Sequence, residues 1–133
     1  MSVVVRLTRN RFPEIARRLP VATRQVVEET LAEIETHAKT EMAAAKSGRW
    51  YGDHQASAPG EAPAVDDALL INSIQQSPVV NGSGEVYTNA EHAVIMEHGA
   101  PMANIEPRPF FAPAAEAARP NFMRKMGDLE SRL

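Results

Sequence analysis

The chain contains four histidines and seventeen acidic residues, so acid–base pairs and metal clusters are the first sites to consider. His92 and His98 are six residues apart, which puts them on different sides of a helix, whereas a two-histidine metal site needs a spacing of three or four. Glu91 and His98 share a helix face, but roughly 10 Å separates them along the axis. That distance is too long for a base and the group that orients it. These spacings indicate surface or interface side chains.

The other reactive side chains form no catalytic pattern. Asp53 and His54 are neighbours in sequence, but adjacency alone does not orient an imidazole towards a carboxylate. Ser57 lacks the surrounding sequence of a nucleophile elbow. Asp66 and Asp67 are two acids alone, which is more typical of a helix start or a solvated turn than of a cation site. The sequence therefore predicts a protein that is not an enzyme, with no cofactor and no metal.

The composition is typical of a small folded domain. With 133 residues, of which 44% are hydrophobic, we expect one domain over residues 1–133. There is no cysteine, which excludes disulfides and thiolate metal sites. Residues 1–10 have no signal-peptide pattern, and no stretch has the length of a membrane span. We expect a protein made in a cytoplasm, or assembled there into something larger.

The charge balance argues against a protein that grips DNA. The net charge is −3, whereas proteins that hold nucleic acid by its phosphates are normally basic on one face. Six arginines do gather near the N-terminus: Arg6, Arg9, Arg11, Arg17, Arg18 and Arg24. We interpret them as a solvated or partner-facing helix surface. A nucleic-acid-binding module remains the less favoured alternative.

Apolar spacing predicts one long amphipathic helix. Pro13 suits a first helical turn, and Pro20 is expected to open a second helix. Lys46 and Gly48 are typical of a last turn and the residue beyond it. Between Pro20 and Lys46, apolar residues recur at spacings of three and four and form a stripe along one side of the helix: Val27, Leu31, Ile34, Ala38, Met42 and Ala45.

Short β elements are expected on either side of this helix. Residues 3–7 alternate as in a strand, with Val3, Val5 and Leu7 on one side. Two β-prone runs, Val79-Val80 and 85–88, flank the turn sequence at 81–84, Asn-Gly-Ser-Gly, which predicts a hairpin.

The C-terminal third is predicted to be helical. Asn89 is expected to cap a short helix over 91–98 that ends at Gly99. A last helix through 114–118 is expected to break near Pro120 and resume over 122–133. The fold class is therefore α+β: a long amphipathic helix and C-terminal helices packed on a small antiparallel β-sheet, with a long extended proline-rich loop.

That extended loop covers residues 47–66. About twenty residues without periodicity form an unusually long connection, and such loops are either disordered or functional. Trp50 and Tyr51 favour function, because a large aromatic pair generally packs on a surface. The alternatives are an ordinary intrachain connection, or stacking on single strands beside Arg49. The predicted subunit or partner interface consists of Arg49, Trp50, Tyr51, His54, Gln55, Pro59, Gly60, Glu61 and Pro63.

Two stretches resemble a known family. The first runs from His54 to Asp66, reads HQASAPGEAPAVD, and continues to Leu70 and Ser73-Ile74. The second begins at Tyr87, passes through AEHA at 90–93 and MEHG at 96–99, and ends in PRPFFAPA at 107–114. Together they resemble the siphophage neck and tail-completion family of gene-product-ten-like tail components, over roughly residues 46–118. The second stretch supplies a predicted structural motif: Glu97, His98, Gly99, Arg108, Pro109, Phe110, Phe111 and Pro113.

The chain departs from the family pattern at three places. Asp67-Ala68 stands where the family has Thr-Gly, His98 stands for Phe, and Ala100 stands for Thr. These changes affect local packing or a partner contact. They remove no catalytic group, because the family has none.

The resemblance implies a structural virion protein of the phage head-to-tail interface. It implies a homo-oligomeric ring, expected to be a hexamer. The expected partners are other neck proteins and the tail tube or terminator. DNA is expected only as cargo that passes through, and no membrane contact is expected. One domain of this size has a radius of about 14 Å, and six in a ring leave a hole on the order of 25 Å, wide enough for duplex DNA. The alternative is a tail terminator that caps the tail tube. Either role places the protein in the virion, assembled in the host bacterial cytoplasm.

The resemblance also suggests how the proline-rich parts act. The loop at 47–66 is expected to reach onto a neighbouring subunit or adjoining ring, because proline keeps it extended and lowers the entropy lost on docking. Residues 107–113 are expected to fix the approach of the last helix, with Phe110 and Phe111 packed beneath it.

Overall fold

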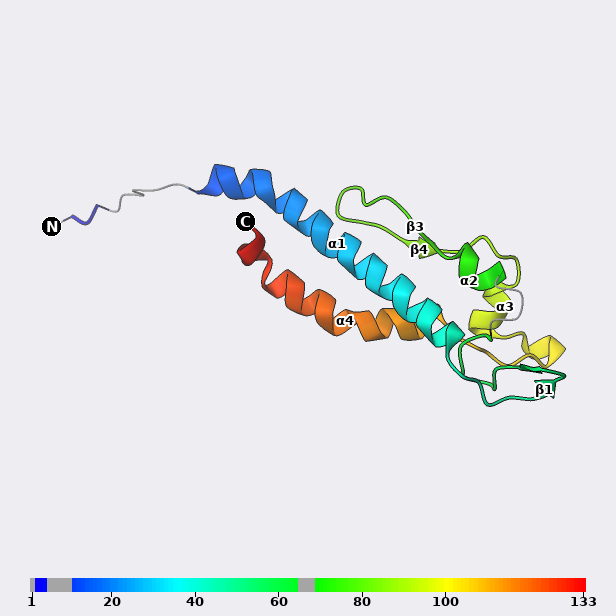
Figure 1. Ribbon diagram of the computed structural model, residues 1–133. Helices are drawn as coiled ribbons and strands as arrows, with labels where there is room; N and C mark the ends of the chain where they lie inside the picture. Colours follow the sequence, from blue (N-terminus) through cyan, green and yellow to red (C-terminus); the bar gives the residue numbers. More distant parts are fainter. Residues whose placement is uncertain (1, 5–10, 65–68) are drawn as a thin grey trace.

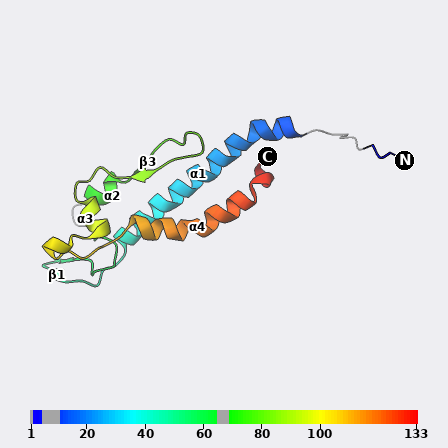
Figure 2. The ribbon, with the colours of Figure 1, turned by 180° about the vertical axis from the view of Figure 1, so that it is seen from behind.

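The structure is a computed structural model that describes residues 2–4, 11–64 and 69–133. Its two long elements are α1 (Phe12–Ala43) and α4 (Phe111–Gly127), which lie side by side and run in opposite directions (Figure 1). The hairpin of β3 (Gln75–Gln76) and β4 (Val86–Tyr87) packs against α1 on the side away from α4, as both views show (Figure 2). The predicted α+β class is confirmed.

The smaller elements gather near the C-terminal end of α1. They are β1 (Trp50–Tyr51), β2 (His54–Gln55), α2 (Leu69–Ser73), α3 (Ala93–His98) and the short 3-10 helix η1 (Pro101–Ala103). A second 3-10 helix, η2 (Leu129–Arg132), follows α4.

Helix α1 buries one side and pairs charges on the other. Its buried residues are Ala22, Val26, Leu31, Ala38 and Met42. The predicted stripe is confirmed at Leu31, Ala38 and Met42, whereas Ala45 lies beyond the helix and is exposed. On the polar side, Glu14 pairs with Arg18 at 3.2 Å and Glu35 with Lys39 at 3.7 Å, at the helical spacing of four.

The prediction that Pro20 opens a second helix is wrong, because α1 runs through it. Proline leaves the carbonyl four residues earlier, that of Ala16, without its helical partner. Both residues are exposed, so water can replace the missing donor. Packing of the turns on either side then keeps the helix continuous.

Helix α1 also ends earlier than predicted. Its last residue is Ala43, and Ala44 is already extended, with φ −68° and ψ 158°. Lys46 lies outside the helix, not in its last turn, but its Nζ donates to the carbonyl oxygen of Glu41 at 2.6 Å. A positive charge still caps this end, from the following segment.

Helix α4 is continuous over the predicted break. Pro113 lies in its first turn, where the missing amide has no helical partner to lose, and Pro120 is exposed. Ala114 and Ala118 are almost fully buried. Their small side chains allow the close approach of α4 to α1.

The predicted hairpin is confirmed. Gln75 pairs with Tyr87 and Gln76 with Val86, and an isolated bridge joins Val80 to Ser83. Asn81 and Gly82 form the turn, with φ of 52° and 75°, which suits the Asn-Gly sequence of a two-residue hairpin loop.

Other local expectations were wrong. Asn89 does not cap α3, which starts only at Ala93, and the amide of Ala90 is bound by the Thr88 hydroxyl at 3.1 Å. Of the predicted first strand, residues 3 and 4 form no strand and residues 5–7 lie outside the described residues.

The core lies where α1, α2, α3 and α4 converge. Its buried residues are Ala38, Met42, Leu70, Ile74, Ala93, Phe110 and Ala114. Phe110 immediately precedes α4 and is only 2% exposed, so the start of α4 is fixed to the end of α1. The segment that carries the predicted interface leaves from this same place.

Candidate functional site

Residues 48–56 form a small hairpin beyond the end of α1, which we call the tip hairpin. Trp50 pairs with Gln55 and Tyr51 with His54. Its open end is closed by two backbone hydrogen bonds, from Gly48 to Ala56 and from Ala56 to Arg49, both at 3.0 Å. The predicted loop therefore contains secondary structure.

The proline-rich half of the predicted loop is held on its own chain. The amide of Gly60 donates to the carbonyl of Pro107 at 3.0 Å, and Arg108 Nε donates to the carbonyl of Ser57 at 3.3 Å. Ser57 and Pro63 are buried, whereas Pro59 is exposed. These residues pack on their own chain, and the contact of residues 47–66 with a neighbouring subunit stays a prediction. Residues 65 and 66 lie outside the described part of the chain.

Glu61 and Ser47 close the base of this segment. The Glu61 carboxylate accepts the Ser47 hydroxyl and also the Ser47 amide, at 3.2 Å to each oxygen. These hydrogen bonds, with the nearby charge of Lys46, hold the pKa of Glu61 below its usual value. Glu61, a predicted interface residue, thus binds its own chain.

The outer end of the tip hairpin faces solvent. Trp50 is 62% exposed and Tyr51 is 58% exposed. The Arg49 guanidinium lies 5.1 Å from the centre of the Tyr51 ring, a cation–π distance. Gly52, with φ +63°, and the exposed Asp53 form the turn. We call residues 50–53 the aromatic tip.

Another exposed apolar side chain lies at the same end of the molecule. Helix η1 is next to the tip hairpin in both ribbon views (Figures 1 and 2). Its Met102 is fully exposed. Large apolar side chains gathered on one surface are typical of a protein contact. The tip is therefore the candidate functional site.

The second sequence motif forms the support of this site. Glu97, at the end of α3, accepts the amides of Phe110, Phe111 and Ala112 at 2.8, 3.0 and 2.8 Å, and so caps α4. The expected packing of the two phenylalanines is confirmed for Phe110, which is buried, and their ring centres are 4.5 Å apart.

The backbone conformation of Gly99 requires glycine. Its φ is +72°, and a Cβ there would lie 2.7 Å from the carbonyl oxygen of Ile105. The neighbouring His98 is exposed. Glu97 and Gly99 therefore fix the backbone of the motif, and His98 does not contribute to the core.

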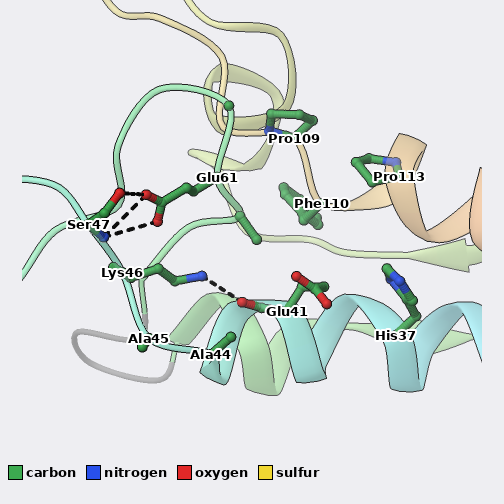
Figure 3. A pocket seen from close by; sticks show the side chains of 12 residues that line it. His37, Glu41, Ala44, Ala45, Lys46, Ser47, Glu61, Pro109, Phe110 and Pro113 are labelled. Carbon is green, nitrogen blue, oxygen red and sulfur yellow. Dashed lines mark hydrogen bonds between the residues drawn. The ribbon is translucent and has the colours of Figure 1, made fainter.

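An open cleft of about 710 Å³ lies between the end of α1, the base of the loop and the start of α4 (Figure 3). His37 and Glu41 line it from α1, and Pro109, Phe110 and Pro113 line its opposite side. Lys46 and Glu61 border it too, and both are engaged in the contacts given above. Burial lowers the pKa of the Lys46 ammonium group.

The polar groups of this cleft hold the loop to the body. Over residues 2–4, 11–64 and 69–133, no group of three or more His, Asp or Glu side chains is placed to hold a metal ion. Lys46, Ser47 and Glu61 thus hold the base of the loop that carries the tip hairpin.

The N-terminal arginines are partly neutralised within α1. Glu14 pairs with Arg18, and more weakly with Arg11 at 4.0 Å, while Arg24 lies 3.8 Å from Glu28. Arg6 and Arg9 lie outside the described residues. The paired arginines suit the solvated helix surface that the sequence favoured.

From the sequence, Asp53 was considered only as a partner of His54, and the turn that it forms with Gly52 was not predicted. The signal was present, since a Gly-Asp pair between Tyr51 and His54 is a two-residue hairpin loop. The capping role of Glu97 had no local signal, because its partners follow thirteen to fifteen residues later.

Comparison of the chain with protein-family models, with curated proteins and with solved structures gives no match. In the described part of the chain, no helix combines the length and apolarity needed to span a membrane.

Proposed function

We propose that this chain is a structural subunit of a tailed-phage particle, forming a ring at the joint between head and tail through which DNA passes. The observation that carries the proposal is the aromatic tip, where Trp50 and Tyr51 face solvent on a hairpin fixed to the body. Its place would be in the virion, after assembly in the host cytoplasm.

An exposed aromatic pair on a fixed support is well suited to binding another protein. Trp and Tyr dominate contact energies because each buries a large surface, about 150–250 Å². Backbone hydrogen bonds between Gly48, Arg49 and Ala56 already order the tip hairpin, and Ser57 and Gly60, which follow it, are hydrogen-bonded to the 107–108 segment. Less entropy is then lost when a partner binds.

The two sequence stretches that resemble the neck and tail-completion family meet at this support. The first contains Ser57 and Gly60, the second contains Pro107 and Arg108, and two hydrogen bonds join them. The pattern of that resemblance thus coincides with one structural unit, the base of the tip hairpin.

The net charge of the chain is more typical of a channel through which DNA passes than of a protein that binds DNA tightly. With a net charge of −3, a ring of such subunits would not hold the phosphate backbone tightly. DNA that must slide through the joint would meet little resistance.

Replacement of Trp50 and Tyr51 by serine tests the proposal. Both side chains are exposed, so the variant should keep the wild-type circular dichroism spectrum and thermal midpoint. It should fail to join tail tubes or connectors in co-assembly viewed by electron microscopy. Met123→Ser is the matched control, because Met123 is exposed to a similar degree, 63%, on α4.

Complete particles formed with the Trp50, Tyr51 double variant would contradict the proposal. Crosslinking of the wild-type chain separates the two possible positions. Products with the connector indicate the neck, and products with the tail tube indicate a terminator.

A further inference from the structure

A second apolar surface lies at the other end of the body. It is a groove of about 570 Å³ between the N-terminal half of α1 and the turn of the β3–β4 hairpin. Three of its apolar side chains are exposed: Leu19 at 40%, Val21 at 46% and Val80 at 65%. We call it the helix–hairpin groove. Its volume lies within the range of about 300–1,000 Å³ typical of ligand pockets, so it has room for a large aromatic side chain.

We infer that the aromatic tip of one copy docks in the helix–hairpin groove of the next copy, which makes the ring proposed above a head-to-tail assembly. Both surfaces are apolar, and their charges are complementary. Asp53 is in the tip, and Arg24 lines the groove.

The charges at both surfaces are available for this contact. Asp53 is exposed and forms no ion pair with any residue that the structure describes. Arg24 has only the 3.8 Å contact with Glu28, and its side chain is 55% exposed. Docking would bring the free carboxylate to a guanidinium that lacks a close partner.

The tip cannot fill the groove of its own chain. The tip hairpin lies beyond the C-terminal end of α1 (Figures 1 and 2). On its helix side the groove is lined by residues 19–21, 23 and 24, in the N-terminal half of α1. From Arg24 to Ala43 the helix axis extends about 28 Å. Because Ser57 and Gly60, directly after the tip hairpin, are hydrogen-bonded to the 107–108 segment, the tip cannot swing back over that distance.

A symmetric tip-to-tip contact is disfavoured as well. It would place the Asp53 carboxylates of two copies near each other, and like charges across a contact are repulsive. Two different surfaces on one body instead give a heterologous contact, and such contacts close into rings when the rotation between copies permits.

The absence of cysteine makes a crosslinking test clean. The test uses a chain that carries both Asp53→Cys and Arg24→Cys. It is oxidised at high protein concentration, once alone and once with tail tubes present. We expect a ladder of disulfide-linked multimers that ends in one closed species. Mass spectrometry then reads the number of copies. A mixture of the two single-cysteine chains should give cross-linked dimers of tip and groove variants but no such ladder.

The matched control replaces Arg24→Cys by Arg119→Cys. Arg119 is exposed on α4 and contacts Glu116 at 3.3 Å, much as Arg24 contacts Glu28. We expect at least about tenfold less crosslinking from the control pair. Equal yields from the two pairs, both with and without tail tubes, would overturn the inference.

Substitutions in cysteine-free chains give an independent measurement by sedimentation. Trp50→Ala should weaken self-association by about 30-fold or more, as loss of a central aromatic contact does. Asp53→Arg or Arg24→Asp alone should weaken it by about fivefold, and the two together should restore it. Failure of the double reversal to restore association would exclude this pairing.

These outcomes are separable from failure of the proposed function. If the tip-to-groove cysteine pair gives the disulfide ladder but the chain never joins phage components, the contact between copies is supported and the phage role is contradicted. A chain that joins tail tubes through Trp50 without any ladder shows that the tip binds a different protein.

Discussion

The carboxylate of Glu97 accepts the backbone amide of Phe110 at 2.8 Å, which ties the end of α3 to the start of α4. The same carboxylate binds the next two amides, so a side chain from a distant part of the sequence caps α4. Phe110 in turn fills the core beside α1. One acidic residue thus fixes the start of α4 next to the end of α3.

Glu97→Gln should destabilise the fold by about 1–2 kcal/mol, since it removes the charge that faces the N-terminus of α4 and one of the two acceptor oxygens. Urea unfolding followed by circular dichroism measures the change. Glu91→Gln is the control. Glu91 lies exposed in the turn before α3, the helix that contains Glu97, so its substitution should have no comparable effect. An unchanged unfolding midpoint for Glu97→Gln would show that the cap is unimportant.

The contact of α1 with the C-terminal end should depend on pH through Glu29. Hydrogen bonds from Arg132, at 2.9 and 3.0 Å, and from Lys125, at 3.1 Å, lower the pKa of Glu29 from 4.5 to about 2. A lowered carboxyl pKa in the folded state adds stability above the unfolded-state value, and that stability is lost as the pH falls. We therefore expect the loss between pH 4.5 and about 2.

Thermal unfolding of wild type and Glu29→Gln across this range tests the expectation. The difference between them should be largest at neutral pH and shrink towards zero as the pH approaches 2. It should also shrink in high salt, because the side chain is 44% exposed. A constant difference at all pH values would contradict the role of the charge.

Gly84 allows the β3–β4 hairpin to approach α1 closely. A Cβ at this position would lie 2.7 Å from Leu31 Cδ1 and 3.2 Å from Val79 Cγ2. Leu31 is only 7% exposed and has little room to move. Gly84→Ala should therefore cost about 1–3 kcal/mol through overpacking.

Chemical unfolding of two further variants checks the cause. Gly127→Ala meets nothing within 4 Å and should be neutral or slightly stabilising. In the second, Leu31→Val added to Gly84→Ala removes a methylene from the crowded contact and should recover part of the loss. Additive effects of the two substitutions would show that they do not interact.

The sequence predicted those parts of the fold that are determined by residues close together in the chain. Leu31, Ala38 and Met42 lie buried at the spacings expected of an amphipathic helix, and Asn81-Gly82 makes its turn because few other pairs adopt two positive φ angles. Pro20 and Pro120 misled the prediction, because tertiary packing keeps a helix continuous through a proline that faces water.

The candidate site was predictable only in part, for the same reason. Trp50 and Tyr51 were identified by side-chain type, and both are exposed as a contact would require. The anchoring of the proline-rich half depends on hydrogen bonds such as that from Gly60 to Pro107, forty-seven positions away. No local pattern encodes such a pair, so the loop was expected to extend further than it does.

Trp50 is the single tryptophan of the chain, so its fluorescence reports directly on the aromatic tip. At 62% exposure, its emission in the monomer should be near that of tryptophan in water and strongly quenched by iodide. If the tip docks in an apolar groove, emission should shift to shorter wavelength and quenching should fall as the protein concentration rises. Val80→Asp places a charge in the groove of every copy and should abolish both changes, while Val94→Asp, exposed to a similar degree on α3, should leave them intact. A blue shift that persists in Val80→Asp would place Trp50 in some other contact.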